Sequence, residues 1–228
     1  GRVEEAETSY RKSITFNNTF AGAYSNLANL LGEIGRPEEA ETCCRKAILL
    51  EPINAQAQNN LGNIYREIGF LKKAELSYQR AITTEPYYAE AHNNLGNVEK
   101  EFGRLEQAED YYKKAIAHKA DFTVALFNLS TLLYGRGQYA EAILYLEDVK
   151  GEQSQELLLK CFFHLGYSSR FYEELDRLII AKAVNPTLGS LTMRGEIKFG
   201  VAKNNIFASD PINFCVSKNL SECLKIQL

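Results

Sequence analysis

A period of 34 residues is the feature that most constrains the fold of this chain. Four glycines mark it at equal spacing, namely Gly35, Gly69, Gly103 and Gly137. Around them, "NLANLLGEIGRPEEAETCCRKAILLEP" recurs as "NLGNIYREIGFLKKAELSYQRAITTEP", and two further variants follow. A fixed period of this length is typical of a stacked array, in which each small unit buries its apolar face only against its neighbours.

Each unit has the pattern of two helices. Apolar residues recur at helical spacing before each of the four glycines and again after it. Glycine between two such stretches indicates the tight turn of a helical hairpin, because it tolerates positive φ. Pro52 and Pro86 follow the second stretch of their units and are expected to end it. The sequence therefore predicts an all-α array of antiparallel helix pairs.

Small residues recur at fixed positions of the repeat. The columns are Ala28, Gly62, Gly96 and Ser130; Ala40, Ala74, Ala108 and Ala142; and Ala47, Ala81 and Ala115. A large side chain at such a position would push two helices beyond their usual packing distance of ~8–10 Å. We therefore expect these columns to mark the lines along which the helices approach most closely.

These columns resemble the tetratricopeptide repeat (TPR) family. They share its small residue after a leucine, its Gly at the turn, its Ala early in the second helix, and its later aromatic, Ala and closing Pro. Glu99 departs from the usual Tyr of the first helix, and Ala120 departs from the closing Pro. The resemblance implies a right-handed TPR superhelix, a solenoid of antiparallel helix pairs. The first helices would line a concave groove and the second helices would form the outer wall.

The domain organisation follows from the register of the repeat. We expect a TPR array over 1–150, made of a partial repeat (1–20) and repeats at 21–54, 55–88, 89–122 and 123–150. A divergent closing repeat is expected at 151–186, and a C-terminal helix and capping segment at 187–228. Because residues 1–20 have the pattern of a second helix alone, we expect further repeats upstream in a parent protein. The apolar side chains of Val3, Ile14 and Phe16 would then be uncovered, which suggests self-association through an exposed repeat end.

Two columns of asparagine lie within the expected first helices of the repeats. Asn26, Asn60, Asn94 and Asn128 share one repeat position, and Asn29, Asn63 and Asn97 share the position three residues later. Positions three apart lie on one helix face. An Asn side chain can pair with both the C=O and the N–H of a peptide unit. With neighbouring helices ~10 Å apart and an extended peptide rising ~3.3 Å per residue, the columns would meet about every third peptide unit.

Two interpretations of the asparagines stay open. They could bind the backbone of an extended peptide, or they could form hydrogen bonds to the next repeat and hold the stack together. The first interpretation gains from a resemblance to the asparagine ladder in the TPR superhelix of O-linked N-acetylglucosamine transferases. That resemblance implies that the column from Asn26 to Asn128 grips the backbone of an extended segment.

Other groove positions would add side-chain selectivity. The candidates are Tyr24, Gln58, His92, Arg66 and Lys100. Some TPR proteins use basic groove residues to clamp a C-terminal carboxylate, but this mode is disfavoured here. Each basic candidate has an adjacent Glu, at positions 67 and 101, and Glu33 continues this acidic column. Local charge pairing at solvated helix ends is the simpler interpretation.

Composition excludes several classes of function. The formal net charge of −3 leaves no basic face for nucleic acid. No apolar run reaches the ~20 residues that span a membrane. The cysteines form no CxxC pair and the histidines no HxD or HExxH pattern, so we expect neither metal nor cofactor nor catalysis, and a reducing cytoplasmic setting. The sequence therefore predicts a protein–protein interaction scaffold that binds a partner protein or an extended peptide. The alternative is the substrate-recognition arm of a larger enzyme, a glycosyltransferase or a 2-oxoglutarate oxygenase, with its catalytic domain outside this chain.

Overall fold

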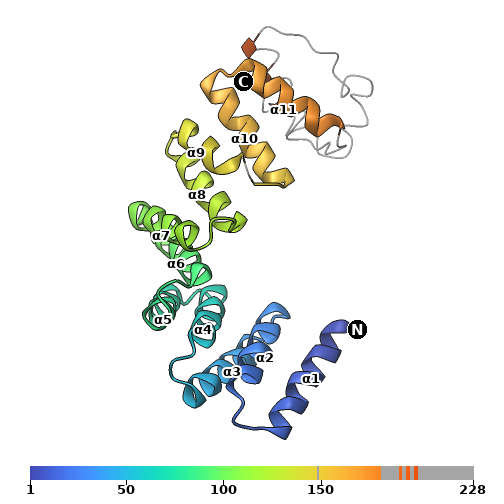
Figure 1. Ribbon diagram of the computed structural model, residues 1–228, viewed down its shortest axis with the longest axis vertical. Coiled ribbons are helices and arrows are strands. Elements are labelled where there is room, and N and C mark those ends of the chain that lie inside the picture. Colours follow the sequence, from blue (N-terminus) through green and yellow to red (C-terminus); the bar gives the residue numbers. More distant parts are fainter. Residues whose placement is uncertain (148, 181–189, 192–193, 196–197, 200–228) are drawn as a thin grey trace. The chain divides into compact units, whose positions relative to one another are not determined.

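The computed structural model describes residues 1–147, 149–180, 190–191, 194–195 and 198–199, and within this part the chain is helical, with no strand. Figure 1 shows the helices in sequence order. Their bounds are α1 Arg2–Phe16, α2 Ala21–Glu33, α3 Pro37–Leu50, α4 Ala55–Glu67, α5 Leu71–Thr84, α6 Ala89–Glu101, α7 Leu105–His118, α8 Thr123–Gly135, α9 Tyr139–Leu146, α10 Glu152–Leu165 and α11 Ser168–Ile180. The predicted all-α fold is confirmed.

The repeat glycines end the first helix of each pair. Gly35 adopts a φ of +74°, and the N–H of Arg36 donates to the carbonyl of Leu31 over 2.8 Å. Such a bond spans five residues and is the signature of a helix terminated by a left-handed residue. The other three repeat glycines have φ between +75° and +80°. A side chain there would be strained, which explains why the period is marked by glycine.

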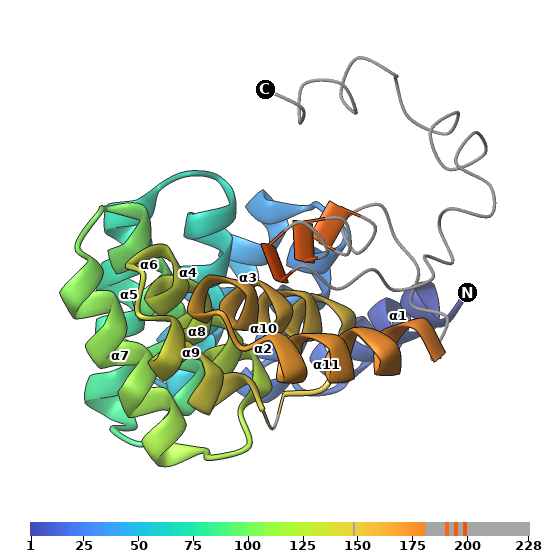
Figure 2. The same cartoon turned by 90° about the horizontal axis from the view of Figure 1, so that it is seen from above.

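The chain forms two compact units, Gly1–Leu129 and Ser130–Leu228. In the first unit, α2 pairs with α3, α4 with α5, and α6 with α7. The first helices also follow one another directly, since α2 contacts α4 and α4 contacts α6. In Figures 1 and 2, α5 and α7 lie on the same side of the α4 and α6 layer. The side of that layer that faces away from α5 and α7 therefore presents the first helices α4 and α6.

Complementary side-chain sizes lock each first helix onto its second helix. A Cβ on Gly62 would lie 2.5 Å from the ring of Tyr78, and one on Gly96 would lie 2.7 Å from the ring of Tyr112. Both tyrosines are fully buried. The first full repeat holds Ala28 and Cys44 at the equivalent positions, and both are buried as well. A larger residue on one helix is thus matched by a smaller one on its partner.

The second unit contains α9, α10 and α11, with α10 packed on both of the others. Gly166, with a φ of +77°, ends α10 and starts the turn into α11. The helix pair α10 and α11 lies in the range expected for a divergent closing repeat. The capping segment expected at 187–228 lies outside the described residues, apart from six helical positions at 190–191, 194–195 and 198–199.

Candidate functional site

The asparagine columns gather on one surface of the first unit, which we call the amide face. It carries Asn26 and Asn29 of α2, Asn60 and Asn63 of α4, Asn94 and Asn97 of α6, and Asn128 of α8. Exposure varies along it. Asn26, Asn29 and Asn63 are exposed, the side chains of α6 and α8 are half-buried, and Asn60 is only 6% exposed. The equivalent positions therefore do not have equivalent environments.

The first column links each repeat to the preceding one. Nδ2 of Asn60 donates to the Ser25 carbonyl over 3.1 Å. Nδ2 of Asn94 donates to Oδ1 of Asn59 over 3.0 Å, and Nδ2 of Asn128 donates to Oδ1 of Asn93 over 2.9 Å. These bonds are the ones that the stack-holding interpretation requires. Oδ1 of Asn94 accepts from Nδ2 of Asn93 over 3.5 Å, whereas Oδ1 of Asn60 and Oδ1 of Asn128 are left over within the described residues. Binding of a peptide through this column stays a prediction.

The second column links the two helices of one repeat. The hydroxyl of Tyr78 donates to Oδ1 of Asn63 over 2.8 Å, and the hydroxyl of Tyr112 donates to Oδ1 of Asn97 over 2.8 Å. Burial raises the pKa of both tyrosines, so their hydroxyls stay protonated and remain donors. The hydroxyl identifies Oδ1 of each asparagine as the acceptor. The Nδ2 donors of Asn63 and Asn97 have no partner within the described part of the chain.

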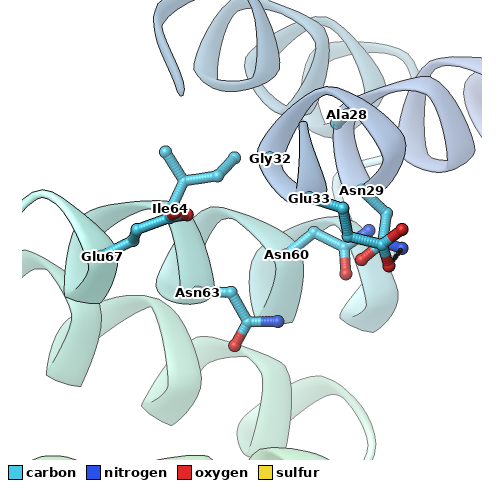
Figure 3. A pocket seen from close by; sticks show the side chains of 8 residues that line it. All are labelled: Ala28, Asn29, Gly32, Glu33, Asn60, Asn63, Ile64 and Glu67. Atoms are coloured by element: carbon cyan, nitrogen blue, oxygen red, sulfur yellow. Dashed lines mark hydrogen bonds between the residues drawn. The ribbon is translucent and has the colours of Figure 1, made fainter. Parts of the chain in front are cut away.

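The first full repeat, at 21–54, departs from this arrangement because it has Cys44 in place of tyrosine. Asn29 lacks a hydroxyl partner and instead donates from Nδ2 to Oε1 of Glu33 over 2.8 Å. A pocket of about 240 Å³ opens beside this pair, between α2 and α4. Figure 3 shows its lining side chains. They come from Ala28, Asn29, Gly32, Glu33, Asn60, Asn63, Ile64 and Glu67, so the pocket holds two carboxylates and no basic residue.

The expected selectivity residues of the fourth repeat position lie inside the stack. Gln58 is 5% exposed and His92 is 5% exposed, while Tyr24 packs against the alanine cluster of Ala21, Ala47 and Ala57. Tyr24 and His92 pack against the second helix of their own repeat, at Ala47 and Tyr111. Gln58 and His92 are therefore almost fully covered, and contact of either residue with a ligand stays a prediction.

His92 belongs to an aromatic cluster at the junction of repeats. Its Nε2 lies 2.8 Å from the Pro86 carbonyl oxygen, and its ring centroid lies 5.1 Å from that of His118 and 6.1 Å from that of Tyr111. Burial lowers the pKa of His92, with His118 and Lys114 acting in the same direction. The imidazole is therefore held neutral and acts as a packing residue.

Arg66 and Lys100 are half-buried on the first helices. Neither forms an ion pair within the described residues, so the expected local pairing with Glu67 and Glu101 is not made. The same position in the first full repeat is Gly32. The repeat pattern predicts the acidic column of Glu33, Glu67 and Glu101 but does not single out Gly32. The signal was available, because comparison at the 34-residue period shows one glycine where two basic residues follow.

The N-terminal helix has an uncovered side. Phe16 is 98% exposed and Val3 is 44% exposed, whereas Ile14 and Tyr10 pack against the core of the following repeats. Self-association through this end stays a prediction. In the described residues, no cluster of three or more His, Cys, Asp or Glu side chains could hold a metal ion. No helix among them is long and apolar enough to cross a bilayer.

Three family models described as tetratricopeptide repeat match residues 21–54, 54–121 and 99–160. The chain belongs to the tetratricopeptide repeat (TPR) family. No curated protein sequence matches it. TPR arrays are protein-interaction scaffolds, and the coarse expectation of a scaffold is supported at this level.

Solved TPR structures share the fold. MamA is 26% identical, with a TM-score of 0.55 over 64% of this chain and 86% of MamA. PilF of Pseudomonas aeruginosa is 20% identical, with a TM-score of 0.72 over 85% of this chain and 90% of PilF. YrrB, a TPR protein with an unusual peptide-binding site, is 22% identical, with a TM-score of 0.60 over 78% of this chain and 95% of YrrB. At this identity, the likeness to PilF and YrrB concerns the fold alone.

Proposed function

We propose that this protein is a non-enzymatic scaffold that binds an extended peptide segment of a partner protein along the amide face. One observation carries the proposal: the two asparagine columns keep complementary free atoms after the internal hydrogen bonds are made. The Oδ1 atoms of Asn60 and Asn128 have no donor among the described residues. The Nδ2 atoms of Asn63 and Asn97 have no acceptor there.

The free acceptors lie in one column and the free donors in the other, which suits a peptide backbone with both kinds of group. The first column offers oxygens to the N–H groups of a peptide, and the second column offers N–H groups to its carbonyls. The contacts with neighbouring repeats and with the buried tyrosines hold these amides in place before a ligand arrives. Such preorganisation lowers the entropic cost of binding. Because backbone groups are common to all residues, this grip would tolerate many ligand sequences.

The peptide-binding site of YrrB supports the same direction of inference. YrrB shares the fold and is described as binding a peptide, at a site called unusual. The residues of that site are not carried over to this chain. What supports the proposal here is the set of unsatisfied amide atoms on the first helices.

The test removes the free donors without disturbing the internal bonds. In the double variant Asn63→Asp and Asn97→Asp, each side chain keeps the oxygen that receives a tyrosine hydroxyl and loses only Nδ2. A peptide selected from a displayed library of short peptides serves as the probe, and its affinity is measured by fluorescence anisotropy. Two lost hydrogen bonds of ~1 kcal/mol each predict affinity weaker by about tenfold or more.

A matched control separates the lost donors from the added charge. The double variant Asn17→Asp and Asn18→Asp adds the same charge in the turn before α2, and Asn17 keeps the oxygen that accepts from Thr19. Charge effects fade in high salt, whereas the loss of a donor persists. Equal affinity of the two double variants in high salt, or failure of the library to yield any binding peptide, would reject the proposal.

A further inference from the structure

The pocket between α2 and α4 combines acidic and amide side chains at one step of the amide face. It is lined by the carboxylates of Glu33 and Glu67 and by three asparagines, with Gly32 on its rim. Figure 3 shows Glu33 and Asn29 of α2 facing the α4 side chains. Neither carboxylate forms an ion pair within the described part of the chain. Acidic groups alone do not make a site, so the amides decide the argument.

Hydrogen bonding fixes the direction of two of these amides. Asn29 donates to a carboxylate, Oε1 of Glu33, and Asn60 donates to a backbone carbonyl, that of Ser25. Both partners can only accept, so each Nδ2 is committed and each Oδ1 is left over. Asn60 is 6% exposed, lines the pocket, and keeps an oxygen without a donor. A ligand that supplies a donor in the pocket would satisfy this oxygen.

The free oxygens of Asn29 and Asn60 and the carboxylates of Glu33 and Glu67 are therefore acceptors. Nδ2 of Asn63 is the donor that this lining offers to a carbonyl, whereas the two carboxylates repel an anion. A lysine ammonium has three donors and an arginine guanidinium has five, and both carry the complementary charge. Resting on the proposed function, we propose that this pocket receives a lysine or arginine side chain of the peptide bound along the amide face.

Gly32 leaves room for the pocket at this step. The equivalent residues of the next two repeats are Arg66 and Lys100, which bring their own cation to the same place. Gly32 leaves that place empty, and a Cβ there would meet only Cγ1 of Ile64, at 3.9 Å. In the column of Glu33, Glu67 and Glu101, a basic residue thus directly precedes Glu67 and Glu101, whereas Gly32 precedes Glu33.

The repeat itself supplies the decisive variant. Gly32→Arg places in the first full repeat what the second repeat already carries, at a helical position with open space. We expect it to fold like the parent protein and to lose the preference for basic residues. Gly32→Ala is the matched control, because it adds only a methyl group and no charge. It should keep the preference.

The readout is an array of acetylated, amidated peptides in which Lys and Arg are replaced in turn by norleucine and citrulline. The parent protein and Gly32→Ala should bind the basic peptides about tenfold more tightly than the neutral analogues. The double variant Glu33→Gln and Glu67→Gln should lose this difference while Asn29 keeps an oxygen to donate to. Glu101→Gln, outside the pocket, should keep it.

The outcomes separate the two proposals. If the parent protein bound the basic peptides and their neutral analogues with equal affinity, the basic-residue pocket would be overturned and the backbone grip would stand. Unchanged discrimination in Gly32→Arg, with circular dichroism showing a folded protein, would also overturn the pocket. Absence of binding to any peptide by the parent protein would overturn both. A loss of discrimination confined to Gly32→Arg and the double Gln variant, strongest at low salt, is the expected result.

Discussion

The hydroxyl of Tyr78 donates a 2.8 Å hydrogen bond to Oδ1 of Asn63, across the two helices of one repeat. The ring of Tyr78 also lies against Gly62, since a Cβ there would come within 2.5 Å of it. Three residues are thus fixed together, with Gly62 admitting the ring, Tyr78 filling the core, and Asn63 oriented for contact outside. Tyr112, Gly96 and Asn97 repeat the arrangement one unit later. Core packing and the proposed ligand grip are therefore coupled.

Gly62→Ala tests this packing. In an exposed helix, the change from Gly to Ala stabilises by up to ~1 kcal/mol. Here the added methyl group meets a buried ring, and overpacking of this kind costs ~1–3 kcal/mol. We expect the midpoint of urea unfolding to fall for Gly62→Ala and to stay level or rise for Gly32→Ala, which has open space. A higher midpoint for Gly62→Ala would show that the ring is not held as described.

Much of the fold could be predicted from the repeat, since Gly35 and its equivalents fix the turns and the small-residue columns fix the helix contacts. The site could be predicted only in part. Periodicity placed Asn26 and Asn60 in one column, but it could not show that one is exposed and the other buried. Burial of Gln58 and His92 depends on how neighbouring helices cover them. The pocket arises where the repeats differ, at Gly32 and Cys44, and a consensus pattern hides such differences.

The first two members of the first asparagine column, Asn26 and Asn60, should contribute differently to stability. Asn60 is buried and donates to the Ser25 carbonyl, whereas Asn26 is exposed and has no hydrogen bond in the described residues. Asn60→Ala should lower the free energy of unfolding by about 1–2 kcal/mol. Asn26→Ala should raise it by a few tenths of a kcal/mol, because Ala is the better helix former. Equal effects in urea unfolding would contradict the stack-holding role of Asn60.

Glu99 should make stability depend on pH in an unusual direction. It is 4% exposed and pairs with Nε of Arg104 over 2.6 Å. Burial raises the pKa of Glu99, with Arg104 opposing the shift and Glu75 adding to it. A carboxyl whose folded pKa is raised binds its proton more tightly in the folded state. Its stabilising contribution is full below the unfolded pKa of ~4.3 and is lost as the pH rises through the folded value.

Glu99→Gln has no such titration. The stability of this variant relative to the parent protein should therefore increase from about pH 4 to neutral pH, which a series of urea unfolding curves would measure. Glu101→Gln is the control, because Glu101 is exposed on the same helix. A relative stability of Glu99→Gln that falls as the pH rises would mean that the ion pair with Arg104 outweighs burial.

The adjacent thiols Cys43 and Cys44 should differ in reactivity. Cys44 is fully buried within the first full repeat, and burial raises its pKa to about 12. Cys43 is half-buried, and burial raises its pKa by less. Near pH 8 only roughly one in ten thousand Cys44 side chains would be a thiolate, the form that reacts with iodoacetamide. Mass spectrometry of the peptide that carries both residues should find Cys43 alkylated first and Cys44 protected until urea unfolds the repeat. Alkylation of both thiols at the same rate in the native protein would show that α2 and α3 separate readily. The buried cluster that contains Ala28 and Cys44 would then not hold the first full repeat together.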